Sequence, residues 1–307
     1  MDIVLARTFL EIVAAGNFVG AARRLNVTQS TISMRARSLE QQLGRPLFIR
    51  NKTGTLLTPA GQQFLRYATS LIKVWEEARQ QVAIPPGYRA SLVVGGQYSL
   101  WDRLMLKWLP AMERRAPDVA LRAEVGMPAR LMREMAEGII DIGVMYRPQL
   151  RPGLKVERLF DDELVLVSTD SSTGPQLDSR YVFIDWGPEF CAAHAITYPD
   201  YTNPGVTLSL GALGLAYVLE NRRAGYFPKR VVRSHLDRGR LHLVEEAPVF
   251  PYPAYVIYDL GLEQDLIDVA IDEMRKIARA VEESSTDREV LGFDFPRAES
   301  GHAAKAV

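Results

Sequence analysis

The sequence predicts an α/β protein overall, with a small helical N-terminal domain, a long connecting helix and a larger domain of alternating strands and helices. Three observations predict this. Residues 1–58 contain three segments with apolar residues at helical spacing, followed by a hairpin pattern. A long segment with an apolar stripe then ends at Pro85-Pro86-Gly87. Beyond residue 90, β-rich runs alternate with helical patterns, which favours a parallel sheet.

Composition and charge restrict the class of protein. The 307 residues are 47% hydrophobic and 24% charged, which is typical of a globular chain with two or three domains. The formal net charge is zero, but residues 1–84 hold 11 Lys/Arg against 5 Asp/Glu, a net of +6, and the remainder holds 26 against 32, a net of −6. Such segregation is expected when one domain meets phosphate and the other does not.

Cysteine usage and hydropathy indicate the compartment. The single cysteine, Cys191, excludes an intramolecular disulfide and favours a reducing environment. The N-terminus lacks a signal-peptide pattern, and no apolar run approaches the ~20 residues that span a membrane. We therefore expect a cytoplasmic protein without membrane contact.

The stretch from Ala21 to Leu43 has the pattern of two helices joined by a tight turn, with Thr28 as the N-cap of the second. An inward stripe of the second helix is formed by Ile32, Ala36, Leu39 and Leu43. A helix-turn-helix protein reads base edges in the major groove with the outward residues near this helix N-terminus. The expected DNA contacts are Gln29, Ser30, Thr31, Ser33, Met34 and Arg37. The alternative is an ordinary helical hairpin with a solvated face.

The flanking segments complete a small domain. We expect helices over Ile3 to Ala14 and Phe18 to Leu25, the second capped by Asn17. After the second helix of the pair, residues 45–50 read as extended, a hairpin turn covers 51–54, and residues 55–57 return. This two-stranded wing carries three basic residues suited to phosphate contacts: Arg45, Arg50 and Lys52.

Thr58-Pro59 opens a helix that is predicted to run to about Ile84, a length of roughly 39 Å. Its apolar stripe is too long to be covered by the small domain. We expect it to pair with the same helix of a second subunit in a two-fold dimer. The alternative is packing on the C-terminal part of the same chain.

A set of residues at fixed spacing in the first 61 positions forms a distinctive pattern: Phe9, Ala21-Ala22, Leu25, Val27-Thr28-Gln29-Ser30, Ile32-Ser33, Leu39-Glu40, Leu43-Gly44, Leu47-Phe48, Arg50 and Leu57-Thr58-Pro59-Ala60-Gly61. It resembles the winged helix-turn-helix of LysR-type transcriptional regulators, and the rest of the chain fits that family's layout. Two positions depart from the family pattern. Ser30 stands where Pro is frequent, and Met34 stands where a basic or polar residue is common, so the preferred DNA sequence is not implied.

The resemblance implies a division into domains. Residues 1–58 form the winged helix-turn-helix, 59–90 the linker and dimerisation helix with a hinge, and 91–283 an effector-binding domain of periplasmic-binding-protein type. Its lobe I covers about 91–162 and 259–283, and its lobe II covers about 170–252. Two strands, at 163–169 and 254–258, are expected to cross between the lobes. Residues 284–307 are expected to form a flexible tail.

Ligands of open α/β sheets bind outside the carboxyl ends of the strands. Family members hold a small effector in a cleft between the two lobes, and this chain places aromatic and apolar residues at its strand ends. The expected lining is Tyr98, Ser99, Leu100, Trp101, Met127, Tyr146 and Trp186. Such a cleft suits a ligand with a ring or alkyl body. For each aromatic residue alone, core or rim packing is the alternative.

Catalytic patterns are weak in this sequence. The four histidines lack metal-ligand spacing, Cys191 reads as a small buried residue, and no phosphate-binding glycine motif is present. We therefore expect a regulator and not an enzyme, with no cofactor and no bound metal. The expected partners are double-stranded DNA, a small-molecule effector and further copies of the chain, as a homodimer through the linker helix and, by resemblance, a homotetramer, with RNA polymerase in addition. An architectural DNA-binding protein without effector control is the alternative, and an enzyme carrying a basic domain is a third.

Overall fold

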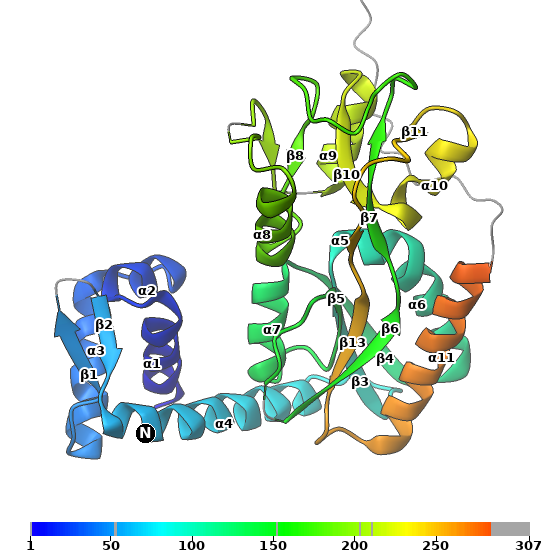
Figure 1. Cartoon of the computed structure of the whole chain (residues 1–307). Helices are drawn as coiled ribbons and strands as arrows, with labels where there is room; N and C mark the ends of the chain where they lie inside the picture. The colour runs from blue at the N-terminus through cyan, green and yellow to red at the C-terminus, as the bar shows by residue number, and fades with distance from the viewer. Residues whose placement is uncertain (1, 52–53, 152, 203, 210, 284–307) are drawn as a thin grey trace, which may run out of the picture. The chain divides into compact units, whose positions relative to one another are not determined.

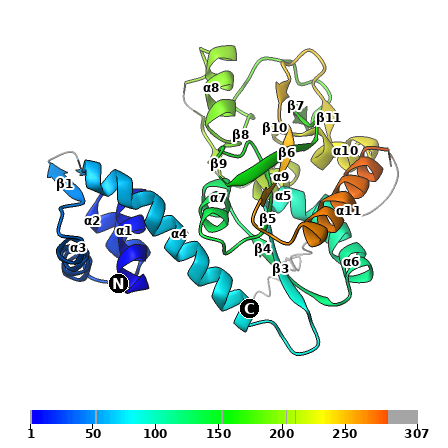
Figure 2. The same cartoon turned by 90° about the horizontal axis from the view of Figure 1, so that it is seen from below.

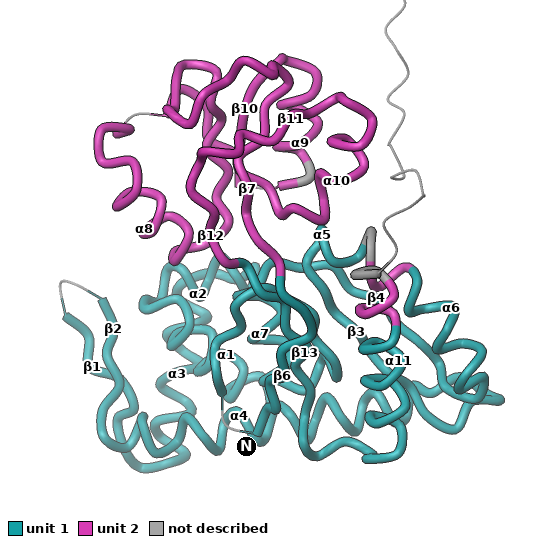
Figure 3. The backbone as a smooth tube through the Cα atoms, turned by 45° about the vertical axis from the view of Figure 1, so that its right-hand side comes forward, with its two compact units in different colours: residues 1–101, 107–161, 252–276 teal, residues 102–106, 162–251, 277–307 magenta. Residues whose placement is uncertain are grey.

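The computed structural model describes residues 2–51, 54–151, 153–202, 204–209 and 211–283. The chain divides into two compact units, which are coloured separately in Figure 3. Unit 1 consists of Met1–Trp101, Lys107–Asp161 and Tyr252–Lys276, and unit 2 contains the remaining segments. The expected tail, 284–307, lies outside the described residues.

Three short helices form the N-terminal domain: α1 (Ile3–Ala15), α2 (Phe18–Arg24) and α3 (Gln29–Leu43) (Figure 1). Each begins at a side-chain cap. Asp2, Asn17 and Thr28 accept hydrogen bonds from backbone N–H groups in the first turns of α1, α2 and α3. Helices α1 and α3 end at Gly16 and Gly44, whose φ angles of 67° and 66° favour glycine. The expected helices and caps are therefore confirmed.

The core of this domain joins α3 to the other helices. Ile32 and Ala36 pack with residues of α1 and α2, and Leu39 packs with α1 and the helix that follows the wing. The expected inward position of Leu43 is wrong, because this side chain is 41% exposed. Leu43 is the last residue of α3, one turn beyond the core contacts that end at Leu39.

The wing consists of two antiparallel strands, β1 (Phe48–Asn51) and β2 (Gly54–Leu57). Its second strand is fastened to the turn between α1 and α2, because the Thr55 N–H donates to the Gly16 carbonyl at 2.9 Å. The Thr58 N–H donates to the Leu47 carbonyl at 2.9 Å and closes the base of the hairpin. Strand β2 is thus tied to the helical body, and the two sides of the hairpin are joined at its base.

Helix α4 (Pro59–Val82) follows the wing and packs along α1 (Figure 2). Its buried face is Gly61, Phe64, Ala68, Ile72 and Glu76. Near its C-terminal end, α4 also contacts the sheet of unit 1. The Lys73 Nζ lies 2.5 Å from Asp259 Oδ2, and the Gln80 side-chain amide donates to the carbonyls of Gly138 and Ile139 at 3.0 Å.

The sheet of unit 1 has the strand order β4-β3-β5-β13-β6. Strands β3, β4 and β5 are parallel, and β13 is antiparallel to both β5 and β6. The strands are β3 (Ala90–Gly96), β4 (Val119–Val125), β5 (Ile142–Tyr146), β6 (Leu154–Phe160) and β13 (Ala254–Asp259). The parallel sheet expected from alternating strands and helices is confirmed for β3, β4 and β5.

Helices of this region pack against the sheet and against one another. They are α5 (Tyr98–Leu100), a π-helical turn η1 (Trp101–Met105), α6 (Leu106–Arg115), α7 (Pro128–Ala136) and α11 (Gln264–Glu283). Trp108 of α6 is fully buried, and its indole N–H donates to the Ala270 carbonyl of α11 at 2.9 Å. Helix α11 is therefore joined to α6, which follows β3 in the chain.

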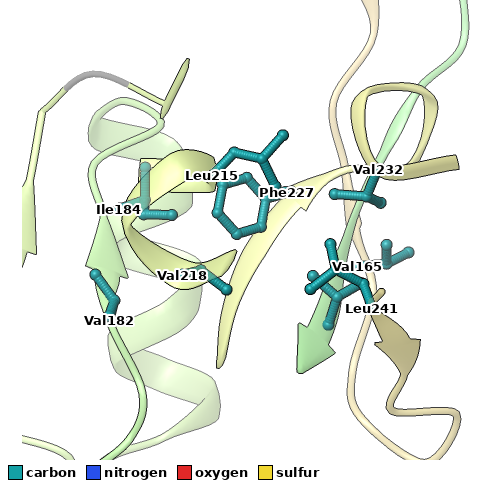
Figure 4. Packing of buried hydrophobic residues seen from close by; sticks show 9 residues of the cluster. Val165, Val182, Ile184, Leu215, Val218, Phe227, Val232 and Leu241 are labelled. Atoms are coloured by element: carbon teal, nitrogen blue, oxygen red, sulfur yellow. The ribbon is translucent and has the colours of Figure 1, made fainter. Parts of the chain in front are cut away.

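Unit 2 contains a second sheet. Strand β7 pairs with β10, β11 and β12, and a short parallel pair, β8 and β9, lies beside it in the fold. The strands are β7 (Glu163–Ser168), β8 (Phe183–Ile184), β9 (Thr207–Leu208), β10 (Ala224–Pro228), β11 (His242–Leu243) and β12 (Phe250–Pro251). The helices are α8 (Pro188–Thr197), α9 (Gly211–Glu220) and α10 (Lys229–Asp237). Figure 4 shows the core, in which Phe227 of β10 lies beside Leu215 of α9, and Val232 of α10 belongs to the same cluster.

Candidate nucleic-acid interface

The first three turns of α3 present a mostly polar surface to solvent. Gln29 and Ser30 are exposed at the helix N-terminus, and Met34 and Arg37 are exposed one and two turns further on, with Met34 65% exposed. Thr31 and Ser33 are half-buried. Because the opposite face of α3 is in the core, these six positions lie on or at the edge of its outer face. The structure therefore brings together all the residues that the sequence predicts as DNA contacts on this helix.

The cap of α3 also organises its first turn. The Thr28 hydroxyl lies 2.7 Å from the Ser30 hydroxyl and 2.9 Å from the Thr31 hydroxyl, and it accepts from the Thr31 N–H at 3.2 Å. Ser30 and Thr31 are therefore held by their neighbour in the free protein. Gln29, the first residue of α3, is exposed in the same capped turn.

Glu40 connects α3 to the wing, a role that the sequence does not reveal. Its Oε1 accepts hydrogen bonds from the backbone N–H groups of Leu47 and Phe48 at 2.8 and 3.2 Å. The interaction fixes the start of β1 relative to the last turn of α3. Glu40 is one of the residues of the family pattern, but only the fold shows what it holds.

The basic residues of the wing differ in their surroundings. Arg45 is exposed just after α3, and Arg50 is exposed on β1. The Arg50 guanidinium carbon lies 3.8 Å from the centroid of the Phe18 ring. Lys52, the third expected phosphate contact, lies outside the described residues.

The carboxyl ends of β3 and β5 are joined by Gln97, which follows β3. Its side-chain oxygen accepts from the Tyr146 N–H at 2.7 Å, and its backbone N–H donates to the Val144 carbonyl at 3.1 Å. The Gln97 carbonyl accepts from the N–H groups of Leu100 and Trp101 and so starts α5. This residue therefore sets the position of the loop that the sequence predicts as an effector contact.

The expected effector contacts of unit 1 fall into two groups. Tyr98 and Met127 are exposed, at 39% and 54%, and Ser99 is half-buried, so these three are available at the strand ends. The others are buried. Leu100 is 2% exposed, the Trp101 indole N–H donates to the Glu124 carbonyl at 2.9 Å, and Tyr146 stacks on Tyr252 with the centroids 4.0 Å apart. The Leu100 side chain and the rings of Trp101 and Tyr146 are therefore used in packing.

Trp186, the remaining expected effector contact, belongs to unit 2. Its indole N–H donates to the Tyr226 carbonyl at 2.8 Å, and its ring lies edge-on to Phe227. The six-membered ring covers Gly211 so closely that an added Cβ there would lie 2.1 Å from it. The small residue at the start of α9 thus makes room for the tryptophan.

Titratable groups of unit 2 show no activated nucleophile among the described residues. The expectation that Cys191 is buried is wrong, because it is half-exposed and its thiol donates to Asp185 at 3.3 Å. Burial and the Asp185 carboxylate raise the pKa of this thiol to about 11, which disfavours the reactive thiolate. His194 is 3% exposed within an aromatic cluster, and burial lowers its pKa to about 4.

Two further searches of the described residues give negative results. They contain no group of three or more His, Cys, Asp and Glu residues that could hold a metal ion. Within them, no single helix is both long and apolar enough to cross a bilayer. Helices α1 and α2 pass that test of length and composition only as a pair, and they are bent by 118°.

A winged helix-turn-helix with an exposed polar face, followed by a long helix and an α/β domain, defines a class of DNA-binding regulators. Residues 3–62 match the profile of the bacterial regulatory helix-turn-helix proteins of the lysR family, and residues 86–278 match that of the LysR substrate binding domain. The chain belongs to the LysR family. It is a LysR-type DNA-binding transcriptional regulator with an effector-binding domain.

Similar sequences are transcriptional regulators. The chain is 31% identical over 201 residues to the HTH-type transcriptional regulator HdfR of Yersinia enterocolitica, covering 62% of this chain and 68% of that protein. It is 28% identical over 261 residues to HdfR of Salmonella schwarzengrund, covering 84% and 92%.

Solved structures share the fold. A full-length OxyR variant from Pseudomonas aeruginosa has a TM-score of 0.54 at 22% identity, with 90% of this chain and 98% of that chain covered. DarR of Vibrio fischeri in complex with DNA has a TM-score of 0.54 at 19% identity, with the same coverage. The expected fold class, an N-terminal winged helix-turn-helix with a two-lobed effector domain, is confirmed.

Proposed function

We propose that α3 reads the base edges of the operator, with Gln29 and Ser33 as the main sequence-reading residues. The observation that carries this is the exposed polar outer face at the capped N-terminus of α3. Gln pairs bidentately with adenine, and a serine hydroxyl can either donate or accept. Met34, exposed one turn on, is suited to contact with a thymine methyl group. Ser30, Thr31 and Arg37 complete the set of contacts.

The wing supplies contacts of a different kind. In this proposal Arg45, Arg50 and Lys52 bind phosphates, which positions α3 without distinguishing sequences. Arg45 precedes β1 and Arg50 lies on it, and both side chains are exposed next to the backbone that Glu40 ties to α3. Base reading and phosphate binding therefore reside on connected elements.

The proposal is tested by selecting a preferred duplex from random DNA, followed by titration of full-length protein on the selected and a scrambled duplex at several salt concentrations. We expect an inverted repeat bound at least ~10³-fold more tightly than the scramble. Gln29→Ala should lower that ratio by roughly tenfold or more, because one bidentate base contact is lost. Arg50→Ala should weaken binding to both duplexes equally and reduce the salt slope by about one.

Arg115→Ala provides the control, because it removes the same charge from an exposed position on α6. It should leave both affinities unchanged. Equal losses on the two duplexes for Gln29→Ala would refute its role as a base reader. A specificity ratio near one for the unmodified chain would instead support an architectural DNA-binding protein.

The C-terminal domain is proposed to respond to a small molecule through Tyr98, Ser99 and Met127, the expected contacts that are accessible at the strand ends of unit 1. Leu100, Trp101 and Tyr146 would support these contacts from the core of unit 1. Full-length LysG of Corynebacterium glutamicum, with a TM-score of 0.51 and 18% identity, was solved with bound effector Arg. A ligand acts as an effector only if it binds two states of the protein with different affinity.

The remaining parts of the proposal concern the compartment, the oligomeric state and the domain boundaries. The chain acts by binding and not by turnover, in the cytoplasm where bacterial DNA is found. It dimerises through α4, and the family resemblance adds a tetramer and contact with RNA polymerase. The division into residues 1–58, 59–90 and 91–283 is the domain organisation that this proposal uses.

A further inference from the structure

Arg50 lies against an aromatic ring on the body of the domain. Its guanidinium carbon is 3.8 Å from the Phe18 centroid, which is van der Waals contact with the ring face. Arg50 belongs to β1, whereas Phe18 is the first residue of α2, so the contact joins two elements that are far apart in the domain's chain order. Cation–π attraction favours this geometry.

The ring that receives Arg50 is fixed. Phe18 is 5% exposed and packs with Ile32 and Ala36 of α3. It also meets Phe48 of β1 edge-on, with the ring centroids 5.7 Å apart and an interplanar angle of 73°. Because Phe18 packs against α1, α3 and β1, its ring cannot move with Arg50. The Arg50 side chain therefore adopts the position that the Phe18 ring sets.

We propose that Phe18 is a positioning residue for the DNA contact made by Arg50. A free arginine side chain samples many rotamers, and ordering it on binding reduces affinity. Contact through the guanidinium face holds the side chain in place but leaves its five N–H donors, which point outward along the edge, available to a phosphate. The proposal rests on the role of Arg50 proposed above.

The same ring places the phosphate contact relative to the base-reading helix. Phe18 shares its core cluster with Ile32 and Ala36, whose helix carries the sequence-reading residues on its outer face. Arg50 and α3 therefore take their positions from one set of core contacts. A correctly placed wing arginine keeps the register in which α3 meets the groove.

Replacement of Phe18 by fluorinated phenylalanines in the full-length protein tests this. Increasing fluorination weakens the negative ring face with little change in shape, so the core stays filled. We expect a stepwise loss of affinity reaching about twofold to fivefold for trifluorophenylalanine, equal on selected and scrambled duplexes. The salt slope should stay unchanged because no charge is removed, in contrast to Arg50→Ala. Phe18→Leu should give a similar loss.

The same series in an Arg50→Ala background separates positioning from a structural role. There, fluorination should have no effect. An equal loss in both backgrounds, or no loss in the unmodified background, would overturn the positioning role while leaving Arg50 as a phosphate contact. If Arg50→Ala itself changes neither affinity nor salt slope, the proposed phosphate contact fails, and with it the need for positioning.

Discussion

Buried charged side chains in unit 1 are matched to backbone or charged partners. Glu76 of α4, 6% exposed, is paired with Arg7 and lies 2.9 Å from Arg79. Asp141, also 6% exposed, accepts the Val93 N–H at 2.7 Å and thereby joins the start of β5 to β3. Burial raises the pKa of Asp141 to about 7, and the negative charges of Asp259 and Glu77 add to this effect, whereas the Val93 hydrogen bond opposes it.

The raised pKa of Asp141 makes stability depend on pH. Between the unfolded value near 3.8 and the folded value of about 7, the unfolded chain loses this proton and the folded chain keeps it, so rising pH destabilises the fold. Asn can still accept the Val93 hydrogen bond but does not ionise. We expect Asp141→Asn to gain stability relative to the natural chain by up to about 1.4 kcal/mol per pH unit across this window. Urea unfolding at pH 5, 6 and 8 measures this, and parallel pH profiles would contradict it.

At the level of elements, the sequence predicts most of this fold because its signals are local. Asn17, Thr28 and Thr58 mark helix starts, and glycines mark two helix ends, so α1 to α4 follow from caps and periodicity. The contact of Arg50 with Phe18 and the hydrogen bonds from the wing to Glu40 do not follow, because they join residues whose proximity depends on tertiary packing. Likewise, the exposed face of α3 is predictable, whereas the use of Tyr146 in packing depends on Tyr252 of a distant segment.

The junction of the wing and α4 depends on a close approach at Gly61. A Cβ added to Gly61 would lie 2.2 Å from the Leu47 carbonyl oxygen and 2.9 Å from a Leu57 methyl group. Gly61→Ala should therefore lower the free energy of unfolding by roughly 1–3 kcal/mol, although alanine favours a helix by about 1 kcal/mol. Thermal and urea unfolding of the full-length chain measure this. Ser70→Ala, on an exposed position of the same helix, is the control and should have little effect. A stabilised Gly61→Ala variant would show that the wing shifts freely.

At the scale of the whole molecule, α4 carries a second apolar face that its own domain leaves exposed. The stripe consists of Tyr67, Leu71, Val74, Trp75 and Val82, with exposed fractions of 56%, 40%, 63%, 46% and 89%. Residues at this helical spacing line one side of a helix, next to the face that packs on α1. A second copy of α4 related by a two-fold axis would cover the stripe with matching residues.

Disruption of this stripe tests the dimer. Trp75→Lys replaces a large aromatic side chain by a charge that a dimer interface would bury, so we expect the dimer dissociation constant to rise at least about tenfold. Analytical ultracentrifugation over a concentration series measures this. Ser70→Lys adds the same charge on the polar side of α4 and should leave the dimer intact. If both variants remain equally dimeric, the dimer forms through another surface.

The position of β13 between β5 and β6 has a consequence for synthesis of the protein. A ribosome delivers the winged domain and α4 as one uninterrupted segment, and both strands of the wing lie within it. The sheet of unit 1 cannot be completed until β13 has been synthesised. Strand β5 ends at Tyr146 and β6 at Phe160, whereas β13, which lies between them in the sheet, begins only at Ala254. Until then, both strands have an unpaired edge of the kind that promotes aggregation. A premature stop codon between Phe160 and Ala254 would therefore release a chain with a complete DNA-binding domain and an incomplete sheet. We expect such truncated products to be degraded rapidly by proteases.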